Sequence, residues 1–139
     1  MKQLRALLGN NGIRGVVRTA DCEVIEFHNP GVKDLFILVN TRPQVLEGAY
    51  VADRVIGRGA ALLLVMGHVS QVFAQLISEQ AVKVLRASEI NVEYESIVPN
   101  IINRDGTDIC PVEKLTMDVT DSKVAFEKIK EFLTTNKII

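Results

Sequence analysis

Hydrophobic and polar positions recur along the chain with the two periods that helices and strands produce. In MKQLRALL the leucines at 4, 7 and 8 have helical spacing, and the Asn-Asn-Gly that follows is a typical stop. Two runs rich in β-branched residues surround Thr19-Ala20-Asp21 and predict a hairpin that ends at Asn-Pro-Gly. The segment VKDLFILVN, residues 32–40, then predicts a helix, although its β-branched content also suits a strand.

Helix and strand alternate in the second half of the predicted structure. Asp53 is expected to cap a helix that runs through Met66, and Ser78 to cap a helix that follows a buried strand over 69–77. NVEYESIV predicts another strand, and TDSKVAFEKIKEFL predicts an amphipathic closing helix. The residues expected to face the core are Val55, Ile56, Ala60, Leu63 and Met66, then Ala81, Val82 and Leu85, and finally Val124, Ala125, Ile129 and Phe132.

This order of elements favours one α/β domain over residues 1–139. Strands that alternate with helices are joined by right-handed crossovers into parallel pairs, whereas the early hairpin is antiparallel. We therefore expect a three-layer α/β/α sandwich with a mixed sheet. The 139 residues and 47% hydrophobic content are sufficient for one core.

Charge and cysteine content restrict the partners and the compartment. The formal net charge of −1 gives no broad attraction to nucleic acid polymers or to anionic membranes. The longest apolar run, residues 60–66, is too short to cross a bilayer. The first residues lack the pattern of a secretory signal, and the two cysteines are far apart without a CxxC pair, so we expect a cytoplasmic protein without a structural metal.

Three stretches carry a family resemblance that covers most of the chain. GAYVADRVIGRGAALL, ISEQAVKVL and VPNIINRDGTDICPVE resemble a small bacterial family known as a domain of unknown function. The resemblance implies a cytidine-deaminase-like fold, in which homodimers form through helices. Zinc deaminases carry His (or Cys)-Ala-Glu at one helix start and Pro-Cys-x-x-Cys at the next, and these residues hold a zinc-activated water.

Both zinc signatures are changed in this chain. The resemblance puts Val51, Ala52 and Asp53 in the first position and residues 78–82, which include Val82, in the second. Valine has no lone pair for a metal, so we expect neither zinc nor another cofactor, and no zinc-dependent deamination. Asp53 would replace the proton-shuttling glutamate with a side chain one methylene shorter.

The expected ligand site lies where two helix N-termini meet at the ends of neighbouring strands, because unpaired backbone N–H groups there favour anions. Arg54 and Arg58, four residues apart and expected on one side of the first of these helices, could bind a phosphate or carboxylate, or could simply be solvated. Asp53, Ser78 and Glu79 could bind ligand donors, or could serve only the helix ends.

The loop after the strand over 91–98 is expected to fold back over this site. Its polar residues form a candidate lid or ligand clamp, namely Asn103, Arg104, Asp105 and Thr107. Asp105-Gly106 is a turn signal. A calcium loop is disfavoured because Ile101 and Val112 stand where carboxylates are needed. Cys110 is a candidate nucleophile or a small buried apolar residue.

Three functions therefore compete. The first is a metal-free domain that binds a small polar ligand, such as a nucleoside or nucleotide, in the cleft at the two helix starts. The second is an enzyme with chemistry that does not use zinc, in which Asp53 or Cys110 is central. The third is a protein-interaction module whose pocket is vestigial. The sequence identifies neither the ligand nor a reaction.

Overall fold

A five-stranded mixed sheet forms the centre of the protein. The computed structural model describes all residues, 1–139. The strands are β1 (Gly15–Arg18), β2 (Val24–Phe27), β3 (Tyr50–Ile56), β4 (Gln71–Ser78) and β5 (Asn91–Val98). Their order in the sheet is β2-β1-β3-β4-β5. β1 pairs antiparallel with β2 and β3, whereas β3, β4 and β5 are parallel, so the predicted mixed sheet is confirmed.

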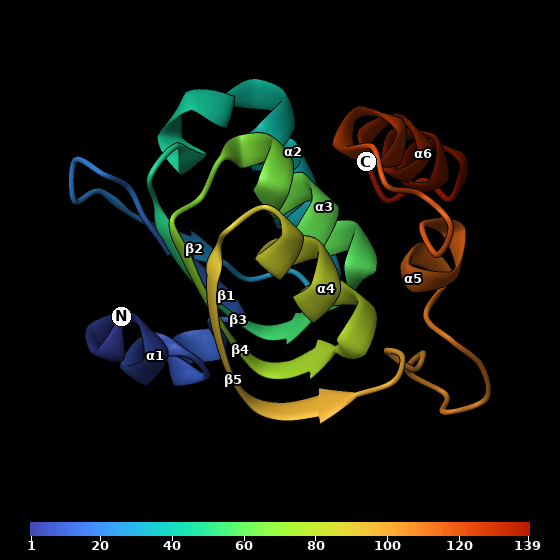
Figure 1. The fold of residues 1–139 in the computed structure, drawn as a ribbon, viewed down its shortest axis with the longest axis horizontal. Helices are drawn as coiled ribbons and strands as arrows, with labels where there is room; N and C mark the ends of the chain where they lie inside the picture. The colour runs from blue at the N-terminus through green and yellow to red at the C-terminus, as the bar shows by residue number, and fades with distance from the viewer.

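The helices are distributed unequally over the two faces of the sheet (Figure 1). One face is covered by α2 (Lys33–Thr41), α3 (Arg58–Gly67) and α4 (Glu79–Ala87), and the other only by α1 (Lys2–Leu7). Outside α3 pack α5 (Pro111–Leu115) and α6 (Ser122–Thr135). Two short 3-10 helices, η1 (Asn10–Gly12) and η2 (Pro43–Leu46), complete the fold.

Side chains alternate between these two faces along the strands, as strand geometry requires. Val17 and Val51 enter the large core beneath α2, α3 and α4, whereas Val16 and Ala52 enter the smaller cluster beneath α1. The small cluster also holds the leucines of α1 that the sequence singles out, at positions 4 and 8.

The helix α3 is apolar around its whole circumference because it is covered on two sides. Its sequence, RGAALLLVMG, contains seven buried residues. The sheet lies on one side of α3 and α6 on the other, and Leu62 packs with Ala125 while Leu63 joins Ile129 in the main core. A helix without a polar face is stable in water only when it is enclosed in this way.

The prediction that Asp53 begins a helix is wrong. Residues 50–56 form β3, and the helix begins at Arg58 after the N-cap residue Gly57. The β-branched and aromatic residues of this segment suit a strand paired on both sides, by β1 and β4. The added strand changes the predicted order to αββαβαβαβαα.

The same correction removes the proposed alignment with the zinc signatures. Val51, Ala52 and Asp53 lie inside a strand and not at a helix start. The argument that a valine replaces a metal ligand there therefore has no structural basis. Ser78 does cap α4, since its hydroxyl accepts a hydrogen bond from the Ala81 N–H at 3.1 Å.

The other predicted elements are confirmed: the first helix, the hairpin, the helix over 33–41, the strands β4 and β5, and the closing helix. Two residues expected in the core are exposed, Val124 by 44% and Val55 by 42%. In α6 Ala125 and Ile129 are buried, as expected, and Leu133 completes a buried stripe at intervals of four residues. None of the helices combines the length and the hydrophobicity required to cross a membrane.

Candidate functional site

A cavity of about 410 Å³ lies between the beginnings of α2 and α3. One wall is formed by the residues before and at the two helix starts, and the opposite wall by the segment after β5. Its lining consists of residues 29–32, 53–55, 57, 59–60, 101–104 and 110–113, together with Arg14 and Leu35. A volume of this size is typical of sites for small organic ligands.

The two helix starts leave backbone N–H groups without acceptors. In α3 the Arg58 N–H is bonded to a carboxylate, but the N–H groups of Gly59 and Ala60 have no acceptor. The N-cap residue of α2, Val32, also provides no side-chain acceptor. Such groups give the cavity walls a positive electrostatic character.

Asp53 lies at the edge of the cavity in β3, opposite Gly15 of β1. Its Oδ1 accepts a hydrogen bond from the Arg54 N–H at 2.7 Å, and no side-chain cation forms an ion pair with it. A side chain at position 15 would crowd the carboxyl, because an added Cβ would lie 3.2 Å from its Cγ. The glycine thus leaves space for this acid.

Burial raises the pKa of Asp53 from 3.8 to about 7. Hydrogen bonds from the backbone N–H groups of Arg54 and Val55 oppose this rise, as does the charge of Arg14, whereas the charge of Asp34 adds to it. Near neutral pH the carboxyl of Asp53 therefore exists in both protonation states, and it can donate or accept a hydrogen bond or a proton.

Arg14, Arg54 and Arg104 line the cavity, and their guanidinium groups have no hydrogen bond or ion pair within the protein. Most other arginines do have partners. Arg5 and Arg42 form ion pairs, Arg58 binds backbone carbonyls, and Arg18 lies over the ring of Tyr50. Arg86, on α4, is the other arginine without a partner.

Glu113 joins the wall of the cavity to the body of the fold. Its carboxylate, 1% exposed, accepts hydrogen bonds from the Arg58 N–H at 2.8 Å, from the Ser78 hydroxyl at 2.7 Å and from the Ile101 N–H. These donors belong to α3, to the end of β4 and to the segment after β5. A negative charge at the start of α3 is also favoured by the helix dipole.

The side chain of Arg58 adds a second link, from the start of α3 to the segment that follows α5. Its Nε donates to the carbonyls of Thr116 at 2.8 Å and Val119 at 3.1 Å, just beyond α5. Arg58 therefore stabilises the wall of the cavity and does not line it. The prediction that Arg54 and Arg58 share one helix face is wrong, because Arg54 is in β3.

The loop that follows β5 folds over the cavity at the starts of α2 and α3, and not over a site at Ser78. Residues 101–104 and 110–113 line the cavity, and the loop closes on itself through an antiparallel bridge between Ile102 and Ile109. Gly106, at φ +71°, occupies the predicted turn, and its N–H donates to the Asn103 carbonyl. Beyond the turn, a hydrogen bond from Lys114 holds the pKa of Asp108 below its ordinary value.

The structure brings together some of the predicted site residues and separates others. Asp53, Arg54, Asn103, Arg104 and Cys110 all line the cavity. Five predicted residues do not. Ser78 is buried beside Glu113, Arg58 binds carbonyls, Glu79 is exposed on the first turn of α4, and Asp105 and Thr107 are exposed at the tip of the loop.

Sequence reasoning missed two important residues, Arg14 and Glu113. Arg14 comes just before β1, and only the strand pairing brings it next to β3. Glu113 lies in a short polar segment, where nothing in the local sequence indicates burial. The sole available signal was the Pro111 that precedes it, which is typical of a first helical turn.

Cys110 is half-buried at the cavity wall, and its N–H donates to the Ile101 carbonyl at 2.8 Å. Neither histidine lines the cavity. His68 is the left-handed C-cap of α3, and the His28 ring lies 3.1 Å from Glu26. Nowhere do three His, Cys, Asp or Glu side chains come together in a geometry that could hold a metal ion.

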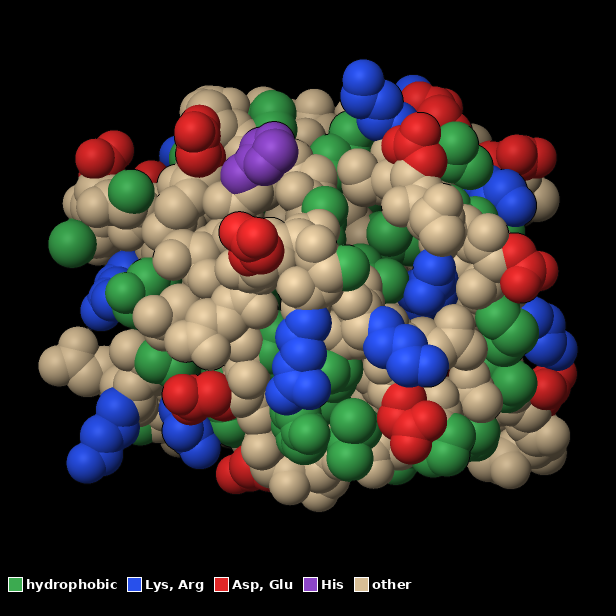
Figure 2. Space-filling model, in the orientation of Figure 1, with side chains coloured by type: hydrophobic (Ala, Val, Ile, Leu, Met, Phe, Trp, Pro, Cys, Tyr) green, Lys and Arg blue, Asp and Glu red, His purple; other side chains and the backbone are tan.

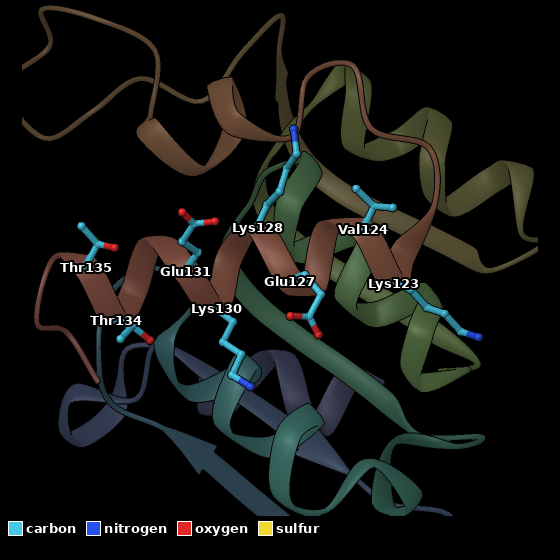
Figure 3. A pocket seen from close by; sticks show the side chains of 8 residues that line it. All are labelled: Lys123, Val124, Glu127, Lys128, Lys130, Glu131, Thr134 and Thr135. Atoms are coloured by element: carbon cyan, nitrogen blue, oxygen red, sulfur yellow. The ribbon is translucent and has the colours of Figure 1, made fainter.

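A second hollow, of about 600 Å³, lies on the outer side of α6 (Figure 3). All eight residues that line it belong to this helix, and their side chains extend from it in several directions. Lysines and glutamates are mixed along it, as on a solvated helix face. The face of the molecule in Figure 2 likewise has dispersed charges of both signs. The cavity at α2 and α3 is therefore the better candidate site.

Comparisons with known proteins agree on one family. The family described as "Domain of unknown function (DUF1893)" matches residues 3–133. The crystal structure of a DUF1893 family protein from Thermotoga maritima is similar at a TM-score of 0.82 and 23% identity, over 94% of this chain and 86% of that chain. None of the curated proteins matches the sequence. The chain belongs to the DUF1893 family.

Proposed function

We propose that this protein binds a small polar ligand, of the nucleoside or nucleotide kind, in the cavity between α2 and α3. The observation that carries the proposal is the cavity itself, which combines unbonded helix N–H groups, three unpaired arginines and the titratable Asp53 with apolar walls. A few polar groups that converge in a largely apolar pocket are typical of small-molecule sites.

The proposal includes a relationship to the cytidine-deaminase fold, in a form without the zinc signatures. The helices whose starts meet at the cavity are α2 and α3, whereas the sequence assigned this place to the start of α3, expected at Asp53, and to the start of α4 at Ser78. Residues 31–34 and 57–60 stand at these starts, and none of them is histidine or cysteine. The expectation that zinc-dependent deamination is absent therefore rests on these two segments, and not on Val51 and Val82.

An enzymatic role for Asp53 or Cys110 is the second candidate. It is favoured by one observation, namely that both side chains line the same cavity. A cytoplasmic location and a homodimer stay predictions, and size-exclusion chromatography with light scattering tests the latter.

A thermal-shift screen with nucleosides, nucleotides and phosphosugars tests the binding proposal. A ligand at 100 times its dissociation constant stabilises the folded state by about 2.7 kcal/mol, which raises the melting temperature by several degrees. The variant Cys110→Phe should fill the cavity and abolish the shift. The control Thr107→Phe alters the same loop outside the cavity and should retain it. If no compound shifts the parent protein, the pocket is vestigial and the interaction module is favoured.

A further inference from the structure

Two of the unpaired arginines lie directly opposite each other in the sheet. Gly15 pairs with Asp53 in the antiparallel register of β1 and β3, so the preceding Arg14 faces Arg54, whose N–H donates to the Arg14 carbonyl at 3.0 Å. Like charges in directly opposite positions destabilise a strand pair. No carboxylate forms an ion pair with either arginine.

The third unpaired arginine reaches the same cavity from the opposite wall. Arg104 belongs to the loop after β5, and the clasp formed by Glu113 and Ile101 holds this loop against the start of α3. Three cations from three separate segments therefore line one cavity.

No nearby carboxylate forms an ion pair with these three arginines. Glu113 accepts hydrogen bonds from three donors, and Asp34, at the start of α2, accepts from the backbone and side chain around Asn29. Asp53 accepts from the Arg54 N–H.

We propose that the ligand is a phosphorylated small molecule whose phosphate is bound jointly by Arg14, Arg54 and Arg104. This inference rests on the proposed function and specifies its ligand class. Three guanidinium groups offer more donors than a single carboxylate can use, whereas a phosphate offers three strong acceptor oxygens and up to two charges. The apolar walls at Val32, Leu35 and Val112 then contact the organic part of the ligand.

The test uses pairs of compounds that differ only in the phosphate group. Binding to the full chain is measured by calorimetry for uridine and UMP, adenosine and AMP, and ribose and ribose 5-phosphate, with inorganic phosphate as a reference. We expect at least one phosphate ester to bind at least 10-fold more tightly than its partner without phosphate. The pair in which this occurs distinguishes a nucleotide from a sugar phosphate.

Arginine variants locate the phosphate. Arg104→Gln changes an exposed loop residue and should leave the fold intact, and it should weaken binding of the phosphate ester by about 10-fold or more, as should Arg14→Gln and Arg54→Gln. The matched control is Arg86→Gln, which removes another unpaired arginine, from α4, and should leave binding within about 2-fold.

The possible failures are distinct. If a compound binds but none of the three phosphate esters binds more tightly than its partner without phosphate, the phosphate inference is overturned and the binding proposal stands. If Arg86→Gln weakens binding as much as Arg104→Gln does, the phosphate ester is attracted only by the overall positive charge. That result would also overturn the phosphate inference. If none of the seven compounds binds to the parent protein, the binding proposal itself fails for these ligand classes.

Discussion

Removal of the Glu113 carboxylate is the sharpest test of how the cavity wall is held. The variant Glu113→Ala leaves the N–H groups of Arg58 and Ile101 and the hydroxyl of Ser78 without their acceptor. A buried donor without a partner costs about 1–3 kcal/mol. Because water in the adjacent cavity can reach some of these groups, we expect a total loss near the lower end of the sum, about 3–5 kcal/mol.

The variant Glu113→Gln separates the individual contacts. The amide oxygen can still accept from Arg58 and Ser78, but the amide nitrogen then faces the Ile101 N–H, so that one donor opposes another. The expected loss is about 1–3 kcal/mol, between those of the alanine variant and the parent. The control Glu79→Ala removes an exposed carboxylate from α4 and should change stability by about 0.5 kcal/mol at most.

Urea unfolding followed by circular dichroism gives the free energy of unfolding and its dependence on urea. The reasoning fails if Glu113→Ala is within about 1 kcal/mol of the parent, or if it is no less stable than Glu79→Ala. A loss of the expected size would show that a polar clasp, and not only apolar packing, fixes the segment that closes the cavity.

Three further results are expected. Because burial raises the pKa of Asp53 to about 7, the folded state binds more protons than the unfolded state between about pH 4 and pH 7, so stability should fall as the pH rises through this range. Unfolding free energies at a series of pH values should show this fall in the parent and less of it in Asp53→Asn; equal slopes would refute the assignment. Gly67→Ala should cost about 1–3 kcal/mol, since the added Cβ would lie 2.7 Å from Leu46 Cδ1, and a neutral result in urea unfolding would contradict that packing. Iodoacetamide followed by mass spectrometry should modify exposed Cys22 faster than half-buried Cys110, and similar rates would show that the wall opens readily.

Most elements could be predicted from the sequence because the spacing of their apolar side chains matches the face that is buried. The leucines of α1 and the cap at Ser78 are local signals, and both are confirmed. The strand β3 was missed because Asp53 before an apolar run has the same pattern as a helix cap. Only its position between β1 and β4, which is a property of the whole sheet, favours the strand.

The candidate site was predictable where one loop supplies several residues, and not where pairing of distant strands creates the neighbourhood. Asn103, Arg104 and Cys110 are close in sequence and line one cavity. Arg14, in contrast, reaches that cavity through its pairing with β3, and no local pattern indicates this contact. Glutamate is usually a surface residue, and only the three hydrogen bonds that the Glu113 carboxylate accepts in the folded protein reveal its role.

The double coverage of α3 has a consequence for how the chain matures during synthesis. The partners of its sheet-facing side include β3, which leaves the ribosome before it, whereas α6 begins at Ser122, far beyond the last residue of α3, Gly67. Until α6 emerges, the outer side of α3, which includes Leu62, exposes apolar side chains to solvent. A nascent chain stalled before α6 should therefore be a client of chaperones.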